Sequence, residues 1–201
     1  MSSFAVEQTT RKRSARQNEL FDQLTALYLD RGFLQFTIEQ AATALRCSKT
    51  TLYALADTRE QLVRSVVLAF FKNATTRVEE KLAAEQDPTR RVEVYLESVA
   101  AELRPASAEF MEDVAAFAPA QQIYARNTKI AAERVRALIL EGVELGAFRE
   151  VQTRFIAEVV SSVMVRIQQR EVAKATGLSD AEAYASLANL VVNGIVRSEA
   201  Q

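Results

Sequence analysis

Within five consecutive positions the chain has a group of side chains that can donate hydrogen bonds: Lys49, Thr50, Thr51 and Tyr53. Ammonium and hydroxyl groups can bond phosphate oxygens or the edges of nucleic-acid bases. The group follows Ser48, which can cap a helix that begins at Lys49, and Leu52 and Leu55 would then face inward. The polar group would lie outward, and Lys49 would add its charge to the positive end of the helix dipole.

A second short helix directly upstream would position this group. Thr37 can cap it, and Gln40 three residues later can return a bond to the cap. One buried stripe follows at helical spacing: Ile38, Ala41, Ala42 and Leu45. Arg46 and Cys47 leave room only for a sharp turn, so the two elements have the spacing of a helix-turn-helix. The alternative is an ordinary three-helix core with a polar outer face.

A third helix is predicted before this pair. Its apolar residues recur at helical spacing: Leu20, Phe21, Leu24, Leu27 and Tyr28. Gly32 offers a C-terminal cap before Phe33. Three helices in this order are what a DNA-binding domain of the helix-turn-helix type needs.

The segment 14–64 resembles the TetR family of bacterial repressors. The resemblance rests on Arg31-Gly32-Phe33, on Thr37, on the helix start at Ser48-Lys49, on Thr51-Leu52-Tyr53 and on Arg59-Glu60. It implies contacts of Thr37, Thr51 and Tyr53 with DNA phosphates. It also implies that Lys49, Thr50 and Ala54 lie near the groove, and that Arg59 stands where a lysine usually reaches phosphate.

Four positions depart from the family pattern. Thr50 replaces a common glycine, Ala54 a common histidine, Leu55 an aromatic residue and Ala56 a phenylalanine. These differences bear on base preference more than on fold. They leave open a second interpretation, a helical ligand-binding or protein-interaction module whose DNA-reading surface has lapsed.

Composition predicts an all-α chain. Of 201 residues 49% are hydrophobic, and there are only five glycines and three prolines, which suits long helices and few loops. The pattern predicts about nine helices. We expect a flexible basic arm over 1–15, the DNA-binding domain over 16–58, and an effector-binding and dimerisation domain over 59–201.

The arm is marked by Arg11, Lys12, Arg13 and Arg16 just ahead of the first helix. Such an arm could reach phosphates or a minor groove, and the alternative is a solubilising tail.

Two helices near 152–175 and 180–197 have wider apolar faces than a core requires, which indicates a partner. In the family that the chain resembles, these helices pair with their copies in a second chain. The alternative is that both apolar faces are buried in the core of a monomer. The predicted homodimer interface comprises Phe155, Val159, Val163, Ile167, Leu187, Leu190, Val191 and Ile195.

The resemblance also implies an effector cavity between the helices of the second domain. Its candidate lining residues are Tyr95, Val99, Phe110, Met111, Val114, Phe117, Tyr124 and Met164. This lining suits a small, mainly apolar effector that releases a repressor from a palindromic operator in double-stranded DNA.

Enzyme chemistry is disfavoured. The chain has no histidine, which excludes Ser-His-Asp, Cys-His and Glu-x-x-His sites, and no phosphate-binding glycine loop is present. We therefore expect no catalytic residues, no metal and no cofactor. The lone Cys47 is interpreted as packing rather than redox sensing. No membrane-length apolar run and no signal peptide are seen, which predicts a soluble, cytoplasmic protein without membrane contact.

Overall fold

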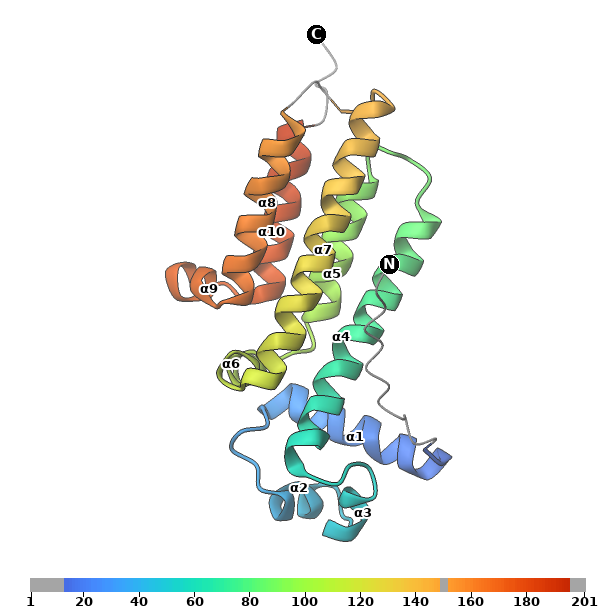
Figure 1. Cartoon of the computed structure of the whole chain (residues 1–201), viewed down its shortest axis with the longest axis vertical. Helices are drawn as coiled ribbons and strands as arrows, with labels where there is room; N and C mark the ends of the chain where they lie inside the picture. The colour runs from blue at the N-terminus through green and yellow to red at the C-terminus, as the bar shows by residue number, and fades with distance from the viewer. Residues whose placement is uncertain (1–12, 149–151, 196–201) are drawn as a thin grey trace, which may run out of the picture.

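The structure, a computed structural model, describes residues 13–148 and 152–195 (Figure 1). The basic residues Arg11 and Lys12 of the predicted arm, and the side chain of Ile195, lie outside the described part. The all-α prediction is confirmed. The described ranges contain α1 (Ala15–Arg31), α2 (Ile38–Ala44), α3 (Lys49–Tyr53), α4 (Arg59–Ala84), α5 (Arg91–Leu103), α6 (Ala108–Ala116), α7 (Ala118–Glu144), α8 (Thr153–Gln168), α9 (Glu171–Thr176) and α10 (Asp180–Ile195).

α2 and α3 begin at the predicted caps, and α1 ends at the predicted glycine. The side chain of Thr37 accepts a hydrogen bond from the backbone of Gln40, whose own side chain bonds back to Thr37. Ser48 caps α3 through the backbone N–H of Thr51. Gly32 ends α1 with φ of 74°, a backbone conformation that glycine adopts without a steric cost. Local sequence therefore sets the start of α2 and α3 and the end of α1.

The remaining helices form an elongated bundle, with α1–α3 at one end (Figure 1). The 26-residue α4 runs from the α1–α3 end into the bundle, where it packs against α5 and α7. α10 packs on α5, and α8 packs on α7. Because α4 contributes to both parts of the molecule, the predicted boundary between residues 58 and 59 falls at the beginning of a continuous helix. That boundary stays a prediction.

The predicted count of about nine helices is corrected to ten for the described ranges. The single helix expected over 152–175 is divided at Arg170, which has φ of 62° and lies in the left-handed region. A residue in the left-handed region interrupts a right-handed helix, and residues other than glycine seldom adopt this conformation. Arginine is a good helix former, so no helix-breaking residue signalled this division in the sequence.

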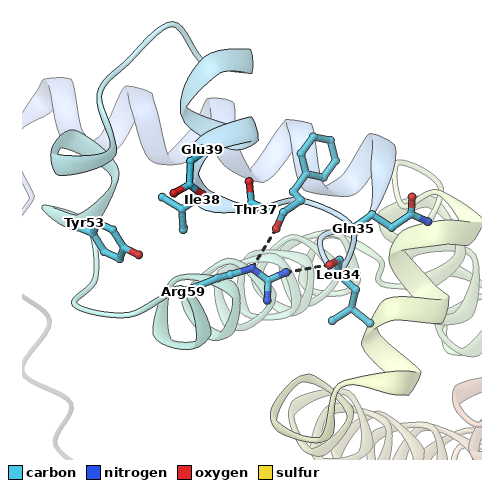
Figure 2. A pocket seen from close by; sticks show the side chains of 8 residues that line it. Leu34, Gln35, Thr37, Ile38, Glu39, Tyr53 and Arg59 are labelled. Carbon is cyan, nitrogen blue, oxygen red and sulfur yellow. Dashed lines mark hydrogen bonds between the residues drawn. The ribbon is translucent and has the colours of Figure 1, made fainter.

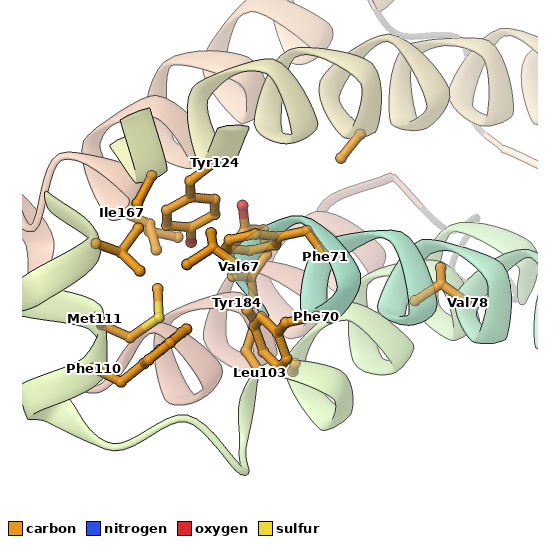
Figure 3. Close-up of a cluster of buried hydrophobic side chains, with 14 of the residues drawn as sticks. Val67, Phe70, Phe71, Val78, Leu103, Phe110, Met111, Tyr124, Ile167 and Tyr184 are labelled. Atoms are coloured by element: carbon orange, nitrogen blue, oxygen red, sulfur yellow. The ribbon is translucent and has the colours of Figure 1, made fainter. Parts of the chain in front are cut away.

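One hydrophobic core joins the two ends of the molecule. It includes Phe33 after α1, Phe70 and Phe71 on α4, and Phe110 on α6. The ring centroids of Phe33 and Phe110 lie 5.8 Å apart at an interplanar angle of 78°, and those of Phe70 and Phe110 lie 5.6 Å apart (Figure 3 shows the part around Phe110). Edge-to-face rings of this kind add to the stability that area burial provides.

Hydrogen bonds also connect α6 to the end of α1. The Asp113 Oδ2 atom accepts from the backbone N–H groups of Phe33 at 2.5 Å and Leu34 at 2.7 Å. The backbone N–H of Ser107 donates to the carbonyl of Leu29 at 2.8 Å. The segment 32–37, here called the α1–α2 connection, is therefore held by a side chain from the C-terminal bundle.

No helix in the described ranges is both long enough and apolar enough to cross a membrane.

Candidate nucleic-acid interface

α3 presents most of the predicted polar group to solvent. Lys49, Thr50, Tyr53 and Ala54 are exposed, whereas the Leu52 side chain is fully buried and fixes the helix to the core. Thr51 is half-buried, and its hydroxyl lies 2.7 Å from that of Ser48. We call the four exposed residues the α3 surface.

Lys49 is already paired within the chain. Its ammonium donates to the carboxylate of Glu39 on α2, and both side chains are more than half exposed. This hydrogen bond is the main reason why the pKa of Glu39 lies below its ordinary value. An exposed pair is weak, so a phosphate could compete for Lys49.

A hollow of about 330 Å³ lies beside the α3 surface (Figure 2). Thr37, Glu39 and Tyr53 lie on its walls, and Arg59 from the first turn of α4 reaches toward the α1–α2 connection. The helix pair α2–α3 thus brings the hydroxyl groups of Thr37 and Tyr53 to one concave surface. Such a surface can accept a nucleic-acid backbone between several hydrogen-bond donors.

Arg59 is placed at this hollow, but most of its donors are used internally. Its Nη2 atom donates to the carbonyls of Phe33 at 2.6 Å and Leu34 at 3.2 Å, and its Nε atom donates to the carbonyl of Phe36 at 3.1 Å. The guanidinium therefore fixes the α1–α2 connection. The phosphate contact that the resemblance implied for Arg59 would rely on the remaining nitrogen, Nη1.

The predicted effector residues pack inside the bundle. Six of them are buried: Tyr95, Phe110, Met111, Val114, Tyr124 and Met164. Val99 and Phe117 are half-buried against the same core. The Tyr124 ring stacks on Phe71 at 4.7 Å between centroids (Figure 3). Of the eight, Met111 also lines a cavity of about 340 Å³ between the α5–α6 connection and the start of α10.

That cavity contains charged residues that the sequence did not single out. Arg170 and Asp180 line it and form an ion pair, with side-chain exposures of 11% and 3%. The Tyr124 hydroxyl donates to the other Asp180 oxygen at 3.0 Å. Desolvation raises the pKa of Asp180, and Arg170 opposes this rise. In the sequence Asp180 has the pattern of an ordinary first-turn acid, so no signal distinguished it.

The predicted dimer residues divide into exposed and buried groups. Phe155, Val159 and Leu190 are 65%, 40% and 68% exposed, and we call these three the α8–α10 face. Val163 is half-buried. Contrary to expectation, three of the eight are buried in the chain's own core: Ile167, Leu187 and Val191. They face α5, α7 and the core because α8 and α10 must also cover the bundle.

The sequence matches no protein-family model and no curated protein at a significant level. Solved structures do match. A TetR-family transcriptional regulator from Thermus thermophilus is 21% identical, with a TM-score of 0.62 over 89% of this chain and 99% of that one. A TetR transcription regulator from Haloarcula marismortui is 16% identical, with a TM-score of 0.69 over 92% and 100%.

A transcriptional regulator from Saccharomonospora viridis in complex with choline is 15% identical, with a TM-score of 0.71 over 92% of this chain and all of that one. These similarities extend through both the α1–α3 end and the bundle. The chain therefore has the all-α fold of the TetR-family transcriptional regulators.

Proposed function

We propose that this chain is a DNA-binding transcriptional regulator of the TetR family that acts as a homodimer and responds to a small effector. The α3 surface carries the proposal, because it presents Lys49, Thr50 and Tyr53 to solvent beside the capped start of α2. In a helix-turn-helix, the second helix enters the major groove and the flanking donors bond the phosphate backbone. Thr37 and Tyr53 are the proposed phosphate contacts.

Dimerisation is supported by the α8–α10 face. Large apolar side chains that are 65% and 68% exposed on neighbouring helices cost free energy in water and favour a partner. A two-fold pair of chains would present two α3 surfaces, and half-sites would then lie one DNA turn apart, about 34 to 36 Å.

An effector role is supported by the fold and by the cavity between α6 and α10. The regulator from Saccharomonospora viridis was solved with choline, which makes a small-molecule site a reasonable expectation for this fold. We expect the effector to act by differential affinity for two arrangements of the α3 surfaces, and a repressor released by its effector is the arrangement we favour.

Three observations favour the second candidate, a module with a lapsed DNA-reading surface. Lys49 is paired with Glu39, and Arg59 donates most of its hydrogen bonds to backbone carbonyls. Neither cation is wholly available to phosphate, and the chain's formal charge of −1 provides no general attraction to DNA.

Selection of bound sequences from a random duplex library, with the purified chain at two salt concentrations, separates the two candidates. We expect a palindrome whose affinity falls as salt rises, because bound Lys and Arg displace counterions. Combining Lys49→Ala with Tyr53→Phe should weaken binding about tenfold or more, whereas Lys72→Ala, an exposed lysine on α4, should change little. Failure of a folded dimer to enrich any sequence would favour the lapsed module.

A further inference from the structure

The cavity between the α5–α6 connection and the start of α10 is here called the Arg170 cavity. Its volume of about 340 Å³ is at the lower end of the range for small-molecule sites. Arg104 at the end of α5, Met111 on α6, and Arg170 and Asp180 lie around it. It therefore has charged and apolar walls on facing elements.

The acceptors around this cavity are already engaged. One Asp180 oxygen accepts from Arg170 and the other from Tyr124. The Glu182 Oε2 atom accepts from both the backbone N–H and the hydroxyl of Ser179, which form the cap of α10. These bonds engage three of the four carboxylate oxygens, so a ligand that donates several hydrogen bonds would have to share or displace them.

The two arginines of the cavity, by contrast, have donors without partners among the described residues. The Nε atom of Arg170 is buried and has no hydrogen-bond partner in the described part of the chain. A guanidinium has five N–H donors, so the bond to Asp180 leaves this edge unused. Arg104 is exposed and forms no ion pair with any described residue. A buried donor without a partner costs free energy, which is recovered only if a small shift of the Arg170 side chain brings an acceptor against it.

The rest of the lining is mainly apolar. Leu103 and Met111 are buried beside the cavity, and the small side chains of Ala106, Ala181 and Ala185 leave its volume open. A matching ligand has a charged acceptor at one end and a short apolar body at the other. We propose that the Arg170 cavity binds a small organic carboxylate, held between Arg104 and Arg170.

Other ligand classes fit less well. An inorganic anion would satisfy the two arginines but would leave the walls at Leu103 and Met111 without an apolar partner. A cation would meet two guanidinium groups, and of the two lining carboxylates Asp180 is already neutralised by Arg170, which leaves Glu182 alone to attract it. A carboxylate joins the arginines through charge-assisted hydrogen bonds, which are the stronger kind.

The position of the cavity gives the ligand a route to the α1–α2 connection. Ser107 and Met111 line it, and the backbone of Ser107 bonds Leu29 at the end of α1. Two residues beyond Met111, Asp113 holds the N–H groups of Phe33 and Leu34. The regulatory consequence rests on the proposed function: a carboxylate that shifts α6 would change the position of the α3 surface relative to the bundle.

Binding is tested on the full chain without DNA, by calorimetric titration and thermal unfolding with hexanoate and benzoate. Hexanol, inorganic phosphate and choline serve as the neutral, inorganic and cationic comparisons. We expect saturable binding and a raised Tm with the two carboxylates only. The proposal is overturned if neither carboxylate binds at about 10 mM, which would reveal even millimolar affinity, or if phosphate or choline binds as tightly.

Variants assign the binding to this cavity. Arg104→Ala should lower the affinity for both carboxylates about tenfold, the effect expected from loss of one charge-assisted hydrogen bond. Ala185→Phe should fill the cavity and block binding. Arg126→Ala, an exposed arginine on α7, is the matched control and should bind like the wild type. Wild-type affinity in both Arg104→Ala and Ala185→Phe would overturn the proposal.

Arg170 needs a paired change, because removing it alone strands the buried Asp180. Arg170→Met with Asp180→Asn removes both charges and keeps an acceptor for Tyr124. We expect a folded chain that has lost carboxylate binding, and retained binding would contradict the role of Arg170. If carboxylates bind but the chain selects no DNA, the proposed function fails and the site stands. If DNA is selected but no carboxylate binds, the reverse holds.

Discussion

The two exposed surfaces of this chain are built from opposite kinds of residue. The α3 surface exposes hydroxyl groups and a lysine over one buried anchor, Leu52. The α8–α10 face exposes large apolar side chains, with Phe155 65% and Leu190 68% exposed. Water solvates the first surface well and the second poorly. The α3 surface is therefore stable in water as it stands, whereas the α8–α10 face would be covered by a second copy in the proposed dimer.

The largest effect is expected from making the second surface resemble the first. Phe155→Glu combined with Leu190→Glu would place like charges where the copies meet. We expect a monomer in sedimentation at micromolar concentration, and a loss of operator affinity of about 100-fold or more because the half-sites no longer act together. Leu68→Glu, at an apolar position on α4 that is 44% exposed, should remain a dimer. A dimeric double variant would show that another surface pairs the copies.

The contact between the α1–α2 connection and α6 can be tested by comparing two glycines that both have a positive φ. Gly32 and Gly146 have φ of 74° and 69°, but a Cβ on Gly32 would lie 2.6 Å from the Asp113 Oδ2 atom, whereas one on Gly146 would meet nothing within 4 Å. In denaturant unfolding we expect Gly146→Ala to cost about 1 kcal/mol and Gly32→Ala about 3 kcal/mol. Equal costs would mean that the Asp113 side chain moves away from the added Cβ at little cost in free energy.

The free energy of unfolding at alkaline pH should report on the buried tyrosines of the bundle. Burial raises the pKa of Tyr95, Tyr124 and Tyr184 above the ordinary value of a tyrosine. The folded chain therefore favours the protonated phenols, and this stability is present below pH 10 and is lost as the pH rises further. Each tyrosine that stays protonated contributes a slope of about 1.4 kcal/mol per pH unit.

Urea unfolding at several alkaline pH values measures that slope. Tyr124→Phe removes one phenol and should reduce the slope by one tyrosine's share, even though it also removes the bond to Asp180. An unchanged slope would mean that Tyr124 ionises in the folded chain.

The smallest effect concerns the charge balance of the α3 surface. Glu39→Gln would release Lys49 and remove a negative charge beside the DNA, so we expect operator affinity to rise about threefold at low salt, in keeping with the weakness of exposed ion pairs. Glu97→Gln, the same charge change at an exposed position on α5, is the control. Lower affinity in Glu39→Gln would show that Glu39 orients Lys49 for binding rather than competing with DNA.

Local patterns predicted the parts of this structure that depend on neighbouring residues. The caps at Thr37 and Ser48 and the end of α1 at Gly32 follow from hydrogen bonds or backbone angles within a few positions. The break at Arg170 could not be predicted in this way, because a good helix former is held in a left-handed conformation beside a partner ten residues away.

Long-range contacts also decided the roles of individual site residues. Arg59 bonds carbonyls more than twenty residues earlier in the chain, so its position in the family pattern did not reveal that most of its donors are occupied. The apolar periodicity of α8 and α10 predicted an excess of apolar surface. It did not separate Phe155 and Leu190, which are exposed, from Ile167 and Leu187, which are buried.

The close approach of Gly32 and Asp113 also constrains how this sequence can evolve. The carboxylate that holds the α1–α2 connection occupies the space that a side chain at position 32 would need. A mutation that adds a side chain at position 32 therefore requires a smaller residue at position 113, and it also strains the backbone at position 32, where φ is 74°. Among homologues with this contact, the two positions should vary together although they lie 81 residues apart in the sequence, and a history of independent change would show that the contact is dispensable.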